Sequence, residues 1–181
     1  MIPASERSES SLQTLHEAYR VRRMISDLAA NDFYCNIDER IYQYLEHRRV
    51  PEERREQIAA KLRSRTERFI EAEGMEVIRL SKAIAVHLKM GNTIYPDYYS
   101  EYIDRRMEMN EALKANNALQ MELDYIGYVL HGDLNKYKSI VLKLNEIFNK
   151  TKKLRKDVNK FLPKLKDLPD ALRESLFKKK K

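Results

Sequence analysis

The chain has 181 residues, enough for one domain with a hydrophobic core, and only 4 Gly and 5 Pro interrupt a composition that is 35% charged. This supply of helix formers, with no alternating β-branched runs, predicts an all-α fold. The single cysteine, Cys35, excludes an internal disulfide. No stretch reaches the roughly 18 apolar residues that a transmembrane helix needs, so we expect a cytoplasmic protein with no membrane contact.

The positive charge is concentrated at the C-terminal end of the chain. Residues 131–181 contain 16 Lys and Arg against 6 Asp and Glu, whereas residues 1–130 contain 19 against 22. The formal net charge of +7 therefore arises entirely from the last segment. This uneven distribution favours an anionic partner, with nucleic acid the first candidate, at one end of the fold.

Hydrophobic periodicity predicts the elements of the first half in chain order. Residues 1–10 are polar and are expected to form a mobile leader, and apolar residues three and four apart predict a helix over 11–30. Residues 31–73 are expected to form a helical insertion, interrupted at Pro51. Gly74 is expected to separate this insertion from the next main helix, although a helix continuing through Gly74 at a cost of about 1 kcal/mol is also allowed.

Three further main helices are expected in the second half. The apolar residues of 75–94 predict a central helix, and the GNTIYPD segment around Pro96 predicts a sharp turn after it. A long helix is expected over 98–130 and a last one, with the clearest periodicity, over 134–160. Together with 11–30 these predict an antiparallel four-helix bundle domain over residues 11–162, followed by a basic C-terminal tail at 163–181.

Four segments of the chain resemble the Avd-like (accessory variability determinant) helical bundles of diversity-generating retroelements. They are SLQTLHEAYRVRRMISDL at 11–28, GNTIYPDYYSEYIDRR at 91–106, LQMELDYI at 119–126 and DLNKYKSIVLKLNEIFNKTKKLRKDVNKF at 133–161. Related members carry a tryptophan before the basic cluster of the last helix, where this chain has Leu154. The resemblance implies a homo-oligomer, in Avd a pentamer, that binds nucleic acid and assists a reverse transcriptase without a catalytic centre of its own.

A basic surface at the end of the last helix is the main candidate site. Lys152, Lys153, Lys156 and Lys160 share one helical face, where like charges repel unless an anion binds. The full set of candidate nucleic-acid-binding residues is Lys150, Lys152, Lys153, Arg155, Lys156, Lys160, Arg105 and Arg106. We expect contacts to the RNA or DNA backbone without sequence readout.

These cations also have simpler, structural interpretations. The lysines can be a solvated helix end that complements the helix dipole, and Arg105 and Arg106 can form structural ion pairs. A protein-interaction module that docks an acidic partner is the alternative function. Tyr95, Tyr98, Tyr99 and Tyr102 surround the Pro96 turn, where they either plug the end of the bundle or, if exposed beside cations, stack on unpaired bases.

Catalysis finds no support in the sequence. The histidines at positions 16, 47, 87 and 131 have no metal-ligand spacing with each other or with Cys35. No glycine-rich phosphate loop or nucleophile motif occurs. We therefore expect a protein that is not an enzyme and that uses no cofactor and no metal.

Overall fold

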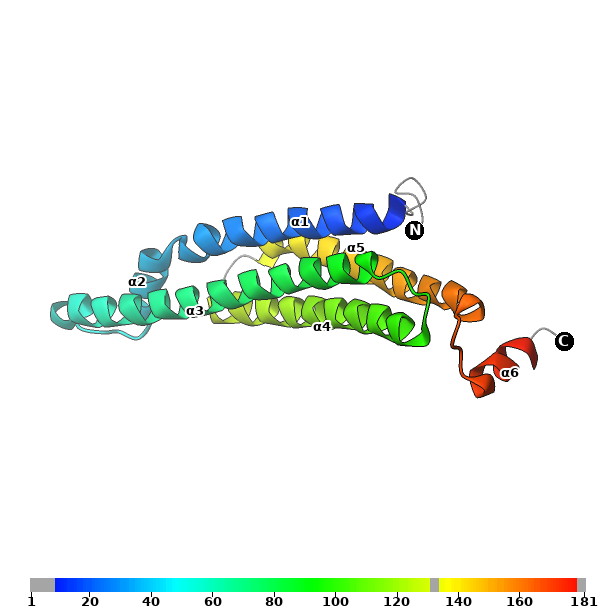
Figure 1. The fold of residues 1–181 in the computed structure, drawn as a ribbon. Coiled ribbons are helices and arrows are strands. Elements are labelled where there is room, and N and C mark those ends of the chain that lie inside the picture. The colour runs from blue at the N-terminus through cyan, green and yellow to red at the C-terminus, as the bar shows by residue number, and fades with distance from the viewer. Residues whose placement is uncertain (1–8, 131–133, 179–181) are drawn as a thin grey trace.

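The computed structural model describes residues 9–130 and 134–178, and all regular secondary structure in these two ranges is helical (Figure 1). The elements are α1 (Glu9–Ala30), η2 (Asp32–Tyr34), α2 (Ile37–His47), α3 (Glu52–Thr93), α4 (Tyr99–Val129), α5 (Leu134–Asp157), η3 (Val158–Lys164) and α6 (Asp170–Lys178). The predicted all-α fold is confirmed. None of the described helices has a stretch apolar and long enough to cross a membrane.

The long helices α1, α3, α4 and α5 run alongside one another, and the colour gradient of Figure 1 shows that their directions alternate along the chain. α3 packs against α1 and α4, and α5 packs against α4 and α1. α2 lies apart from these, against the first half of α3. The turn between α3 and α4 therefore lies at the same end of the molecule as the C-terminal end of α5.

One hydrophobic core lies between α1, α3, α4 and α5. Ile25, Ile84, Leu119 and Leu144 contribute from one helix each, and all are almost completely buried. Burial of each such side chain contributes about 1.5–3 kcal/mol, so the core dominates the stability of the fold. A separate cluster of Ile41, Leu45 and Ala59 fixes α2 to α3.

The expected helix break at Gly74 does not occur, because α3 is continuous from Glu52 to Thr93. Gly74 is buried, and a Cβ built on it would lie 3.5 Å from the Cβ of Ala29. Gly74 lies where α3 packs against α1, and the packing of the whole helix offsets the cost of about 1 kcal/mol that glycine has inside a helix. The expected insertion at 31–73 thus comprises η2, α2 and a first half of α3 that runs directly into the next main helix.

The C-terminal region departs from the expected helix over 134–160 and its basic tail. α5 ends at Asp157, and residues 158–164 form the 3-10 helix η3. Leu165 and Leu168, expected in the tail, are buried with Tyr102 and Val158 in a second small core. Residues 1–8 of the expected leader and the last three lysines lie outside the described residues.

Candidate nucleic-acid interface

The basic face of the molecule consists of Lys152, Lys153, Lys156 and Lys160, all of them exposed. In the described chain, Lys152, Lys153 and Lys156 have no carboxylate partner, and Lys152 Nζ lies 5.4 Å from the ring centroid of Phe148. Lys160 Nζ is 3.4 Å from Asp157, but its side chain is 77% exposed. An exposed pair of this kind neutralises little charge, so the basic face presents four cations to solvent.

The sequence of α5 determines which way Lys152, Lys153 and Lys156 point. Lys160 lies beyond the end of α5, on η3, so the single helical face expected for all four lysines ends before it. Leu144, Ile147 and Thr151 are buried on the side that faces the core, and the Thr151 hydroxyl donates a 2.7 Å hydrogen bond to the carbonyl of Ile147. Because a helix turns about 100° per residue, Lys152, Lys153 and Lys156 lie away from this buried side, and all three are exposed. The core packing of α5 therefore fixes the direction of these three lysines of the basic face.

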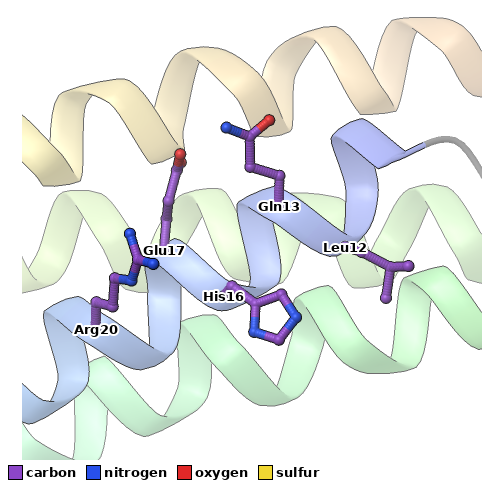
Figure 2. A pocket seen from close by; sticks show the side chains of 5 residues that line it. All are labelled: Leu12, Gln13, His16, Glu17 and Arg20. Carbon is purple, nitrogen blue, oxygen red and sulfur yellow. The ribbon is translucent and has the colours of Figure 1, made fainter.

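Lys150, a candidate contact residue, is instead tied to α1. Its Nζ lies 2.6 and 2.7 Å from the two carboxylate oxygens of Glu17. Figure 2 shows Glu17 extending from α1 toward the neighbouring α5. The pair is partly buried, so Lys150 serves to hold α5 against α1 rather than to meet a phosphate.

Arg155 joins α5 to α4 through a neutral partner. One guanidinium nitrogen donates a 2.7 Å hydrogen bond to the side-chain carbonyl of Asn110, and the residue is half-buried. Because the acceptor is an uncharged amide, the positive charge of Arg155 is not cancelled. Arg155 thus positions the helix and adds to the positive potential behind the basic face.

Arg105 and Arg106 hold the start of α4 in place. Arg105 donates a 2.7 Å hydrogen bond to the carbonyl of Ile94 and lies 5.4 Å from the ring centroid of Phe161. Burial lowers the pKa of Arg105. Arg106 bonds to the Asn159 side chain and to the Tyr102 hydroxyl. The partners shown for both arginines are neutral oxygens and aromatic rings, so these side chains are structural without forming the expected ion pairs.

The candidate set thus divides into four exposed lysines and four cations with structural contacts. Exposed lysines also adjoin this set: Lys138 and Lys143 on α5, and Lys164 and Lys166, which follow the basic cluster in the sequence. Lys143 lies on the exposed side of α5, which its helical position alone would have indicated. Lys164 falls in the expected basic tail, because no local pattern indicates that residues 158–168 pack against α4.

Of the four tyrosines around Pro96, two are packed into the protein and two are exposed. Tyr102 is 6% exposed, its hydroxyl donates a 2.9 Å hydrogen bond to Asn159, and its ring stacks on Tyr99. These two rings plug the end of the bundle, as the simpler interpretation predicts. Tyr95 and Tyr98 are 45% and 46% exposed.

A surface depression of about 360 Å³ lies along α1, lined by Leu12, Gln13, His16, Glu17 and Arg20 (Figure 2). All of these residues come from three turns of a single helix, so the depression is a shallow groove. His16 has neither a nucleophile nor a second histidine beside it in the groove. Across the described ranges, no group of three or more His, Cys, Asp or Glu side chains is arranged to hold a metal ion.

Comparison with known proteins gives no assignment for this fold or its basic face. No protein-family model, curated protein or solved structure matches the chain.

Proposed function

We propose that this chain is a non-catalytic nucleic-acid-binding protein whose basic face contacts the phosphate backbone. The observation that carries the proposal is the exposure of Lys152, Lys153 and Lys156 on one rigid helix, with no carboxylate partner in the described part of the chain. Lysine is a flexible point charge, which suits phosphate contacts and does not select a base sequence.

Electrostatics supports a polyanionic partner for this face. Like charges one turn apart on a helix destabilise it by about 0.2–0.5 kcal/mol per pair, and a bound phosphate backbone removes this repulsion. Each neutralised phosphate also releases counterions, which drives binding at low salt. Lys150 and Arg155 support the site indirectly, because their bonds to Glu17 and Asn110 hold α5 in one orientation.

We further propose that the chain is a cytoplasmic accessory of a diversity-generating retroelement and works with its reverse transcriptase. The support is the resemblance of residues 91–106 and 133–161, two segments that contact each other here. Tyr95 packs edge-on against Phe161, and Arg106 bonds to Asn159. A reverse-transcriptase gene with a template repeat beside this gene would support the proposal, and co-purification of the two proteins would test it.

The proposal includes an antiparallel four-helix bundle that assembles into a homo-oligomer, a pentamer by the resemblance. Its support is the alternating direction of α1, α3, α4 and α5, and several large apolar side chains exposed on α4. These side chains are Met107, Met121, Tyr125 and Tyr128, which are 55%, 73%, 50% and 77% exposed. The mass in solution, measured by sedimentation, tests this part: a monomer at micromolar concentration would reject it.

The same α4 side chains favour a second candidate function, a protein-interaction module. In that case the basic face docks an acidic protein surface and the apolar side chains of α4 contact the partner. An assay of nucleic-acid binding distinguishes the two candidate functions, because a protein-interaction module does not need to bind nucleic acid.

The experiment compares two triple variants with the same change in charge. Lys152→Gln, Lys153→Gln and Lys156→Gln together remove three cations of the basic face, whereas Lys61→Gln, Lys82→Gln and Lys89→Gln remove three exposed cations of α3. We expect the first variant to lose about tenfold or more in affinity for RNA and DNA oligomers and the second to change little. Circular dichroism should show both to be as helical as the parent chain. Equal losses would reject a localised site.

A further inference from the structure

We propose that the nucleic acid bound here contains unpaired nucleotides, and that their bases stack on the exposed rings of Tyr95 and Tyr98. The inference rests on the proposed function and adds the class of nucleic acid. It depends on a separate set of residues, those of the turn between α3 and α4, and not on the lysines of the basic face.

Tyr95 presents a ring that is exposed and held in place. It packs edge to face on Phe161, with ring centroids 5.1 Å apart and planes at 88°. The preceding carbonyl, of Ile94, accepts a hydrogen bond from Arg105, and the following Pro96 is buried. The backbone on both sides is thus fixed, and a fixed ring loses little conformational entropy when a base stacks on it.

Tyr98 has a cation over one face of its ring, which leaves the other face for a base to stack on. Lys166 Nζ lies 5.0 Å from the ring centroid and 2.9 Å from the carboxylate of Asp97, which holds the lysine in position. The carboxylate of Glu101 accepts hydrogen bonds from the backbone N–H groups of Asp97 and Tyr98, where the positive end of α4 compensates its charge. An exposed ring next to a cation is the arrangement that binds a base and its phosphate together.

The two rings are connected to the basic face through η3. Lys160 and Lys164 are exposed on this element, and Phe161 between them contacts Tyr95. A strand that follows the cations from α5 onto η3 therefore reaches the tyrosines. In a duplex the bases already stack on each other, so these rings gain a partner only from unpaired nucleotides.

The test compares three fluorescently labelled oligomers of equal length: a single strand, the duplex of the same sequence, and an abasic strand that keeps the phosphates but has no bases. We expect the full chain to bind the single strand on the order of tenfold more tightly than the abasic strand. Tyr95→Ala with Tyr98→Ala should remove this preference and leave affinity for the abasic strand unchanged, whereas Tyr95→Phe with Tyr98→Phe should retain it.

Tyr44→Ala supplies the matched control. Tyr44 is 49% exposed and has Arg48 5.5 Å from its ring centroid, but it lies on α2, far from the basic face. This variant should keep the preference for the single strand. Equal affinity of the parent chain for the single and abasic strands would overturn the stacking inference and leave backbone binding intact. Failure to bind any of the three oligomers at low salt would overturn the proposed function, and the stacking inference with it.

Discussion

Lys150 Nζ lies 2.6 Å from Glu17 Oε1, and this ion pair joins α5 to α1. Both side chains are partly buried, so removing one leaves the other charge without its partner. We expect Lys150→Gln to lower the free energy of unfolding by about 1 kcal/mol, measured by urea denaturation.

A double-mutant cycle shows whether the loss comes from this pair. Glu17→Gln should cost a similar amount, and the double variant should cost less than the sum of the two. Lys153→Gln, an exposed lysine on the same helix, should leave stability within about 0.5 kcal/mol of the parent chain. Strictly additive losses at 17 and 150 would show that the two residues act independently.

Gly91 and Gly74, both in α3, should respond to alanine in opposite directions. A Cβ at Gly91 would lie 2.8 Å from Met109 Cε and 3.3 Å from Glu108 Cβ, and Met109 is fully buried. We expect Gly91→Ala to destabilise the fold by about 1 kcal/mol, since overpacking of 1–3 kcal/mol exceeds the gain in helix propensity. Gly74→Ala, whose nearest contact is an ordinary 3.5 Å, should be stabilising by about 0.5–1 kcal/mol. Thermal unfolding of the two variants measures both, and equal shifts would contradict the close approach of α3 and α4 at Gly91.

Glu122 should make stability depend on pH in an unusual direction. Burial, followed by the nearby carboxylates of Glu73 and Glu76, raises the pKa of Glu122 above its ordinary value of 4.5. An acid with a raised pKa in the folded state stabilises the fold at low pH, and this contribution is lost as the pH rises through the folded-state pKa. We expect Glu122→Gln to stabilise the protein at pH 7 by about 0.2–0.5 kcal/mol. The gain should vanish as the pH falls below 4.5.

Glu111 is the control of opposite sign. A hydrogen bond from Lys114 lowers the pKa of Glu111, so its charged form stabilises the fold above the ordinary pKa and this contribution is lost as the pH falls through the folded-state pKa. Glu111→Gln should therefore lower the unfolding temperature at pH 7. If both variants shifted the unfolding temperature in the same direction, the carboxylate cluster at Glu122 would not be the cause.

Much of the fold could be predicted from the sequence because its signals are local. The expected helix at 98–130 is observed as Tyr99–Val129, since Pro96 breaks the chain and the apolar spacing continues throughout. The continuity of α3 through Gly74 could not be predicted from local signals, because the helix is stabilised by packing against α1 and α4, which lie elsewhere in the chain. The packing of Leu165 and Leu168 depends likewise on Tyr102, more than sixty positions earlier in the chain.

The candidate site was predictable in outline only. Helical geometry alone indicates that Lys152, Lys153 and Lys156 share an exposed face. It does not distinguish them from Lys150 and Arg155, whose partners Glu17 and Asn110 lie on other helices. The sequence also does not distinguish the exposed Tyr95 and Tyr98 from the more buried Tyr99 and Tyr102, because the burial of these rings depends on where η3 packs.

The central claim is that the basic face binds phosphates, and the salt dependence of single-stranded RNA binding tests it most directly. If the four exposed lysines each neutralise one phosphate, the logarithm of the affinity should fall with the logarithm of the salt concentration with a slope of about −3. In the Lys152→Gln, Lys153→Gln and Lys156→Gln variant the slope should approach about −1. A slope near zero in the parent chain, or the same slope in both proteins, would contradict the claim.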